Sequence, residues 1–277
     1  MTQRKKVEIM KNYFFHSFYL DQPLVLGRAY DIMEPEEILC DTALFIVHGG
    51  GWRSGSKNSF HKIMEAFTQR GVICASTDYR LRAKDAFEQL SDIRSAYEHF
   101  VEFLRKKGLP QKVAVYGESA GAHLASLLLC ASPGECGEAF VPERPWVAPV
   151  KGILQSTPAQ FTPWEDIFPH IWTSMQNIAG APYGKEPGRY ERLSLKNYIR
   201  KENPVLFYAE AQTEEMFPHE YNTQLIEKHH ALGIQSFSKV YKNAEHGFFY
   251  ELTRWQQKEL FEDILLFLQD RSAEIHP

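Results

Sequence analysis

An apolar run, a glycine-flanked serine and a run of small residues follow one another in Lys112-Val-Ala-Val-Tyr-Gly-Glu-Ser-Ala-Gly-Ala-His-Leu-Ala125. The apolar run is typical of a buried strand, and residues 120–129 favour a helix. Glycine at positions 117 and 121 permits a sharp turn between the two elements, because a Cβ atom would obstruct it. Such a turn presents the Ser119 hydroxyl at the positive end of a helix, where an anionic intermediate is stabilised. Ser119 is therefore the candidate nucleophile.

A second glycine motif, His48-Gly49-Gly50-Gly51-Trp52, precedes the first in the chain and also follows an apolar run. Consecutive glycines allow backbone N–H groups to converge on one point, which is what an oxyanion hole requires. We interpret His48 as a residue that holds the shape of this turn. The two motifs lie far apart in the sequence and indicate the same chemistry.

Short apolar runs alternate with longer amphipathic segments, a pattern that favours a parallel sheet covered by helices. The expected strands are 44–48, 72–77, 112–116, 150–154, 205–208 and 237–241. The expected helices are 59–70, 86–107, 120–129, 221–232 and 255–268. An antiparallel hairpin is expected over 6–18 and 24–32. This order predicts an α/β protein with a single domain over residues 1–277, in which about residues 156–203 form a lid or pocket wall.

Composition excludes several classes of protein. The 277 residues carry 31 Lys and Arg against 35 Asp and Glu, a net charge of -4, with 44% hydrophobic and 24% charged residues. This balance argues against a disordered chain and gives no field for phosphates, so we expect no nucleic-acid partner. The sequence contains no membrane-spanning apolar run, no secretory signal and no C-x-x-C pair among its four cysteines. We therefore expect a cytoplasmic protein without a membrane partner.

A nucleophilic serine needs a general base, and the chain has 11 histidines. His246, in Asn243-Ala-Glu-His-Gly-Phe248, lies in a loop between the last expected strand and the last expected helix. His123 lies one turn into the helix after the serine, where a packing or hydrogen-bonding role is the better interpretation. His229 and His230 fall in an amphipathic helix. His246 is therefore the candidate base.

Four motifs in a fixed order carry a family resemblance: HGGGW from His48, DYRL from Asp78, GESAG from Gly117 and EHGF from Glu245. Over about residues 24–268 the chain resembles the α/β-hydrolase fold, and more narrowly the hormone-sensitive-lipase-like and bifunctional acetylxylan/feruloyl-type esterases. The resemblance implies an eight-stranded, mostly parallel sheet with helices on both faces and an insertion after strand 6. It also implies hydrolysis of carboxylic esters by a Ser/acid/His triad. The implied oxyanion N–H groups are those of Gly50, Gly51 and Ala120.

The acid of the triad departs from the family pattern. The family carries G-x-x-D-x-x-V-P after the penultimate strand, and the matching stretch here is Ala211-Gln-Thr-Glu-Glu-Met-Phe-Pro218. This alignment puts Glu214 at the position of the aspartate, and the α/β-hydrolase order allows Asp or Glu there. Glu210, Glu215 and Asp166 are the competing carboxylates.

The 156–203 segment is rich in aromatic residues that could wall an acyl or aryl pocket. They are Phe161, Trp164, Phe168, Trp172, Tyr183 and Tyr190. The same set could instead form a small core of the segment or the contact of a homodimer. Trp52 and Trp164 are the candidate substrate contacts, although Trp52 could also pack under the glycine turn.

Together these residues predict a serine hydrolase of small or short-chain acyl or aryl esters, whose partner is a small-molecule ester. The chemistry needs no cofactor and no metal. An arylformamidase is the alternative enzyme, because Ser119-Ala-Gly-Ala-His-Leu-Ala125 resembles the sequence around the nucleophile of kynurenine formamidases. A non-catalytic receptor on a hydrolase scaffold is the alternative from another class, and only the unusual acid favours it.

Overall fold

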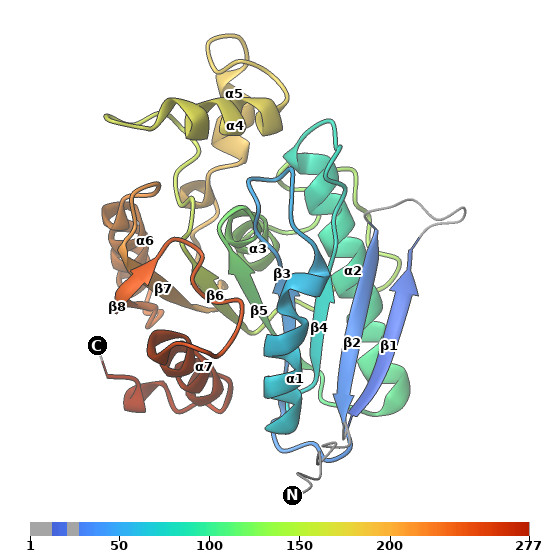
Figure 1. The fold of residues 1–277 in the computed structure, drawn as a ribbon. Coiled ribbons are helices and arrows are strands. Elements are labelled where there is room, and N and C mark those ends of the chain that lie inside the picture. Colours follow the sequence, from blue (N-terminus) through green and yellow to red (C-terminus); the bar gives the residue numbers. More distant parts are fainter. Residues whose placement is uncertain (1–12, 21–27, 277) are drawn as a thin grey trace, which may run out of the picture.

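A sheet of eight strands forms the centre of the molecule (Figure 1). The computed structural model describes residues 13–20 and 28–276. The strands lie in the order β1-β2-β4-β3-β5-β6-β7-β8. Their bounds are β1 Tyr13–Tyr19, β2 Ala29–Pro35, β3 Thr42–Val47, β4 Cys74–Thr77, β5 Lys112–Glu118, β6 Lys151–Gln155, β7 Val205–Thr213 and β8 Phe237–Glu245. This arrangement confirms the predicted fold class.

The central strands are parallel, whereas β1 pairs antiparallel with β2, and β2 antiparallel with β4. Every residue of β3 is buried, which explains why its residues 43–47 are continuously apolar rather than alternating. Val47 at the end of β3 pairs with Gly117 near the end of β5. The two glycine motifs therefore leave the sheet side by side at its carboxyl edge.

The N-terminal hairpin has different bounds from those expected. The parts of the expected strands 6–18 and 24–32 that precede residues 13 and 28 lie outside the described residues. The second strand continues past the expected end to Pro35, because β1 pairs with it as far as Pro35, and its carboxylates are buried with charged partners. Asp31 pairs with Lys57 at 2.6 Å, and Glu34 pairs with Lys107 at 2.5 Å.

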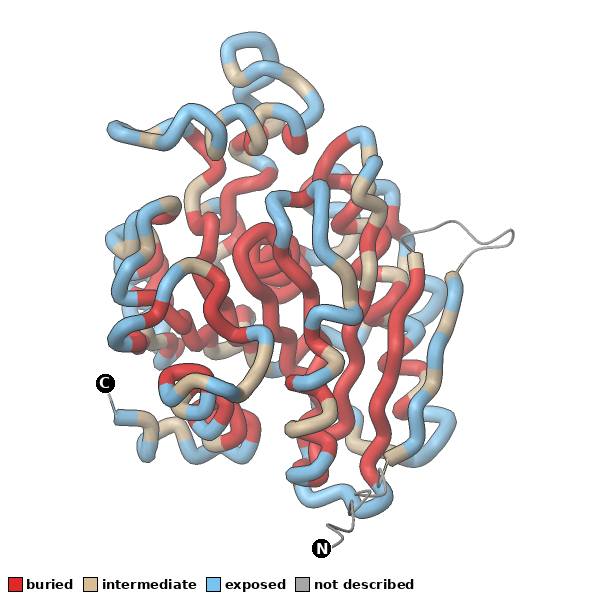
Figure 2. Tube along the Cα trace, in the orientation of Figure 1, coloured by how far each residue is buried: buried red, intermediate tan, exposed pale blue. Residues whose placement is uncertain are grey.

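Helices cover both faces of the sheet (Figure 1), and the strands at its centre are therefore buried (Figure 2). Phe45 and Val47 of β3 join the core under α2, α3 and α6, whereas Leu44 and Ile46 join the core under α1 and α7. The bounds are α1 His61–Gln69, α2 Ala86–Lys107, α3 Ala120–Cys130, α6 His219–Ala231 and α7 Trp255–Leu268. In the described part of the chain, no helix is long and apolar enough to cross a membrane.

The long helix α2 has the predicted bounds because both of its ends are capped. The Asp85 side chain accepts the backbone N–H of Glu88 at 3.1 Å, as an N-cap residue does. Gly108 follows the helix in the left-handed conformation with φ +68°, and basic residues in the last turn complement the helix dipole. α7 likewise spans the predicted residues.

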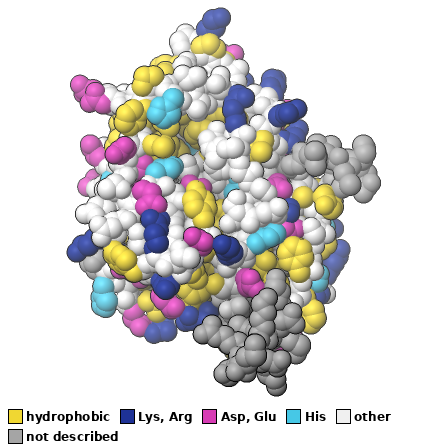
Figure 3. Space-filling model, viewed as in Figure 1, with side chains coloured by type: hydrophobic (Ala, Val, Ile, Leu, Met, Phe, Trp, Pro, Cys, Tyr) yellow, Lys and Arg dark blue, Asp and Glu magenta, His cyan; other side chains and the backbone are white. Residues whose placement is uncertain are grey.

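The 156–203 segment contributes α4 (Pro169–Ala179) and α5 (Pro187–Arg192) and stands above the carboxyl edge of the sheet in Figure 1. Its aromatic residues do not form a separate core. Phe161 and Tyr190 are fully buried in the same cluster as α2 and α3. In Figure 3, apolar side chains gather in the upper part of the viewed face, where this segment lies. The segment is thus anchored by the main core.

Candidate active site

Ser119 lies on a strained turn between β5 and α3. Its backbone has φ +52° and ψ -121°, a conformation that non-glycine residues rarely adopt. The Ser119 N–H donates to the Gln155 carbonyl at 2.9 Å, and the Ser119 carbonyl accepts the His123 N–H at 3.0 Å. A Cβ on Gly121 would lie 2.7 Å from the carbonyl carbon of His48, so only glycine lets α3 approach the end of β3 this closely. The serine is therefore held next to the glycine turn.

His246 connects the serine to an acid. Its Nε2 lies 2.9 Å from Ser119 Oγ, and its Nδ1 lies 2.9 and 3.0 Å from the two carboxylate oxygens of Glu214. With the proton on Nδ1, the imidazole donates to Glu214 and accepts from the serine hydroxyl. Glu214 follows β7 and its side chain is only 2% exposed. The three residues come from three different loops at the carboxyl edge of the sheet.

The competing carboxylates lie elsewhere. Glu210 is buried on β7, where His219 Nδ1 lies 3.0 Å and Asn222 Nδ2 lies 3.3 Å from its carboxylate. Glu215 and Asp166 are exposed. Of the four candidates, Glu214 is the one that the structure brings to His246.

The His246 and Glu214 side chains favour each other's charged forms. Burial lowers the pKa of His246, but the hydrogen bond and charge of Glu214 and the charge of Glu118 outweigh it, so the pKa lies above its ordinary value. Burial raises the pKa of Glu214, yet its contacts with His246 bring the pKa below the ordinary range. An imidazole with a raised pKa is a stronger base for a serine proton.

Ser156, just after β6, links the acid loop to the histidine loop. Its hydroxyl accepts the backbone N–H of Gly247 at 3.2 Å, and it also hydrogen-bonds Glu214. Ser156 belongs to none of the four sequence motifs. A polar residue at the carboxyl end of a central parallel strand is the signal that could have found it.

The glycine turn follows β3 in an unusual conformation. Gly50 has φ +107° and Gly51 has φ +59°. The Gly50 carbonyl accepts both the backbone N–H of Ser54, at 3.0 Å, and its hydroxyl, at 2.7 Å. Ala120 is the first residue of the neighbouring helix α3. The candidate oxyanion donors thus belong to two segments that touch.

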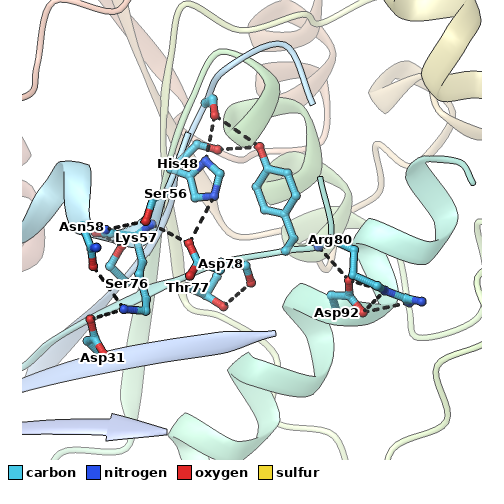
Figure 4. Close-up of polar contacts among 12 residues, drawn as sticks. Asp31, His48, Ser56, Lys57, Asn58, Ser76, Thr77, Asp78, Arg80 and Asp92 are labelled. Atoms are coloured by element: carbon cyan, nitrogen blue, oxygen red, sulfur yellow. Dashed lines mark hydrogen bonds and ion pairs between the residues drawn. The ribbon is translucent and has the colours of Figure 1, made fainter. Parts of the chain in front are cut away.

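The Asp78-Tyr79-Arg80 stretch after β4 braces that turn (Figure 4). The Tyr79 hydroxyl donates to the carbonyls of His48, at 3.0 Å, and Gly49, at 3.3 Å. The Tyr79 ring stacks on the His48 ring with centroids 4.4 Å apart. Asp78 accepts the Lys57 backbone N–H, and Arg80 pairs with the buried carboxylate of Asp92. This gives a physical role to the DYRL motif.

Comparison with known proteins identifies the family. The sequence profile of the BD-FAE family matches residues 30–229, which include both glycine motifs. The chain belongs to the BD-FAE family. It is similar to arylacetamide deacetylase of Oryctolagus cuniculus, with 37% identity over 90 residues that cover 30% of this chain and 23% of that protein. Esterase LipQ of Mycobacterium tuberculosis is 25% identical over 186 residues, which cover 63% of this chain and 42% of that protein. The chain thus matches less than half the length of either relative.

Solved structures share the fold. Esterase B from Lactobacillus rhamnosis superposes with a TM-score of 0.79 at 17% identity, covering 95% of this chain and 87% of that one. The propionate-bound esterase Est2 of Thermogutta terrifontis gives a TM-score of 0.70 at 22% identity, covering 89% and 90%. This BD-FAE family member therefore has the α/β-hydrolase fold, as the four motifs predict.

Within this BD-FAE family fold, Trp52 lies in the core and not at the site. It is 2% exposed, and its indole N–H donates to His123 Nδ1 at 3.2 Å. Its ring contacts Phe161 edge to face at 5.6 Å. The burial of this side chain under the 156–203 segment favours the alternative, that Trp52 packs under the glycine turn. Burial lowers the pKa of His123 to about 4, so this histidine is a neutral packing residue.

Trp164 is half-buried and lies near the histidine loop. Its ring centroid is 6.3 Å from that of Phe217, which is 5.7 Å from that of His246. The Tyr221 ring centroid lies 6.0 Å from that of Trp164. Trp164 therefore stays a candidate for the wall of a substrate pocket.

Among the residues that the structure describes, no group of three His, Cys, Asp or Glu side chains is placed to hold a metal ion.

Proposed function

We propose that this protein hydrolyses carboxylic esters of small or short-chain acyl or aryl groups, with Ser119 as nucleophile, His246 as general base and Glu214 as orienting acid. The observation that carries the proposal is the continuous hydrogen-bonded chain from Ser119 Oγ through both ring nitrogens of His246 to Glu214. Membership of the BD-FAE family and the names of the relatives support the reaction class.

In the proposed reaction, Ser119 Oγ attacks the ester carbonyl carbon while His246 Nε2 takes the hydroxyl proton. The carbonyl oxygen becomes an oxyanion that accepts the N–H groups of Gly50, Gly51 and Ala120. Collapse of the tetrahedral intermediate breaks the ester bond, and the leaving alcohol takes the proton from His246. Water, activated by the same histidine, then hydrolyses the acyl-enzyme.

Two observations support a small substrate and an enzyme rather than a receptor. Phe217 stands close to His246 and Trp164 packs beside Phe217, so the two rings would limit the space beside the reacting carbonyl. A receptor on this scaffold typically lacks a triad member, whereas all three side chains are present and within hydrogen-bond reach here.

The test is hydrolysis of p-nitrophenyl acetate, butyrate and octanoate in the presence of a metal chelator, with Ser119→Ala as the control. Fluorophosphonate labelling of wild type, followed by peptide mapping, reports whether Ser119 is nucleophilic. Ester turnover and labelling at Ser119 would support the proposal. Turnover of N-formylkynurenine without turnover of any ester would favour the formamidase, and neither turnover nor labelling would favour the receptor.

A further inference from the structure

A buried carboxylate that the proposed mechanism does not use lies beside the nucleophile. Glu118 ends β5 immediately before Ser119, and the residue is 2% exposed. Its carboxylate accepts hydrogen bonds from the backbone N–H of Gly49 and from the hydroxyl of Tyr250. Burying an ionisable group costs free energy unless the group is hydrogen-bonded. The two hydrogen bonds offset this cost, and the buried position of the carboxylate calls for a functional reason.

The carboxylate fills the space between the glycine turn and the histidine loop. A Cβ on Gly49, the first glycine of the turn, would overlap Glu118 Oε2. Gly247, which follows His246, has φ +65°, and a Cβ there would lie 2.7 Å from both Glu118 Oε1 and the Tyr250 hydroxyl. One side chain therefore touches both loops that flank Ser119, and each loop has a glycine at the point of contact.

We propose that Glu118 is a positioning residue, whose carboxylate holds the glycine turn and the His246 loop at fixed positions on either side of Ser119. The inference rests on the proposed function, since it assigns the turn and the loop to one reaction. Glu118 acts through Gly49 and Tyr250 and touches no reacting atom. Directional hydrogen bonds to a buried charge are strong and specific, which suits them to this role.

Glu118 also adds to the negative charge around His246. The groups that face His246 are Ser119 from the β5–α3 turn, Glu214 from the loop after β7, and Glu118 from β5. Burial raises the pKa of Glu118, and the hydrogen bonds and His246 reduce this rise. When ionised, Glu118 raises the pKa of His246 together with Glu214.

Three tyrosines stand near the Glu118 carboxylate. Burial raises the pKa of Tyr79, Tyr116 and Tyr250 above the ordinary value, so all three are neutral hydroxyls at working pH. Of these, Tyr250 is partly exposed, which makes it suitable for substitution without disturbing the core.

The decisive variant is Glu118→Gln, which keeps the size of the side chain and an acceptor for Gly49 but removes the charge. We expect kcat for p-nitrophenyl acetate to fall about 10- to 100-fold, with KM changed less than about 3-fold. The pH midpoint of kcat/KM should move to lower pH, because loss of a nearby negative charge makes the His246 imidazolium easier to deprotonate.

Tyr250→Phe provides a second test, since it removes one hydrogen bond and keeps the ring. We expect a fall in kcat of about 3- to 10-fold. Asp263→Asn is the matched control, because Asp263 is also a buried carboxylate that accepts a tyrosine hydroxyl, that of Tyr241 at 2.6 Å, but it lies on α7. The control should retain wild-type kcat and pH midpoint.

The outcomes separate this inference from the proposed function. Suppose that wild type labels at Ser119 and turns over ester. If the Glu118→Gln and Tyr250→Phe variants then match wild type in kcat and pH midpoint, the inference is overturned and the proposed function stands. A loss of kcat in Glu118→Gln that is no larger than the loss in Asp263→Asn would also overturn the inference. If Glu118→Gln does not fold, Tyr250→Phe decides. Wild type that neither labels nor turns over ester removes the proposed function itself.

Discussion

The carboxyl edge of the sheet and the 156–203 segment above it are held together by different forces. At the edge, Ser119, His246 and Glu214 are joined by hydrogen bonds of 2.9 to 3.0 Å between loops anchored on separate strands. In the segment, order comes from ring packing, as where Phe161 stacks on His123 at 4.4 Å. Hydrogen bonds depend on exact donor and acceptor geometry, whereas apolar packing tolerates exchange between side chains of similar volume. Residues at the edge should therefore affect the rate, and residues in the segment should affect stability and substrate choice.

The largest effect is expected at the edge. Ser119→Ala should lower kcat on the order of 10⁶-fold, because the other members of a serine triad contribute little without the nucleophile. Hydrolysis of p-nitrophenyl butyrate measures this directly, and the far-ultraviolet circular dichroism should not change. A residual rate within 100-fold of wild type would show that another group attacks the ester.

The acid should come next. Glu214→Gln should lower kcat about 10³- to 10⁴-fold, since an amide can neither hold the imidazole in its productive tautomer nor stabilise its charge. Glu215→Gln, an exposed neighbour, is the control and should retain wild-type activity. Intact turnover in Glu214→Gln would assign the role to a different carboxylate.

Substitutions in the 156–203 segment should change the free energy of unfolding. Phe161→Ala removes a fully buried ring that contacts Trp52, His123 and Tyr190, so it should lower the free energy of unfolding by about 3–5 kcal/mol. Urea denaturation at fixed pH gives this value. The exposed Phe168, replaced by alanine, should cost less than about 0.5 kcal/mol. Equal losses in the two variants would contradict the view that the main core anchors this segment.

Substrate choice should change at the half-buried tryptophan. Trp164→Ala should raise the ratio of kcat/KM for octanoate over acetate about 10-fold, because it removes a wall beside Phe217 and His246. Trp255→Ala, at an exposed site on α7, is the matched control. An unchanged ratio would place the acyl chain elsewhere.

The pH profile should give the smallest effect. His246 must be neutral to accept the serine proton, so kcat/KM should rise with pH through the apparent pKa of the His246–Glu214 pair, which lies above the ordinary histidine value. In the residual activity of Glu214→Gln, the midpoint should move to lower pH, because the imidazolium loses its partner. An unchanged pH midpoint would show that Glu214 does not raise the pKa of His246.

The strands, the helices and the turns at both glycine motifs could be predicted, because each depends on residues that are close in sequence. α2 is an example, since its apolar spacing and its caps at Asp85 and Gly108 all lie within one segment. The end of β2 could not be predicted, because its last residues pair with β1 and Glu34 is buried with Lys107, which is distant in sequence. The burial of Trp52 could not be predicted for the same reason, as His123 and Phe161, which contact it, belong to two other segments.

The sequence by itself determined the α/β class and the turn at Ser119, because backbone turns and helix ends are encoded by neighbouring residues. It also determined the candidate base, because His246 lies in a loop between the last expected strand and the last expected helix. The family alignment put Glu214 at the acid position, but only the tertiary structure showed that Glu214 reaches His246, whereas Glu210 contacts His219 and Glu215 is exposed. The tertiary structure alone also brought Glu118 between Gly49 and Gly247. A contact between loops on separate strands depends on how the strands are ordered in the sheet, and no local pattern encodes that order.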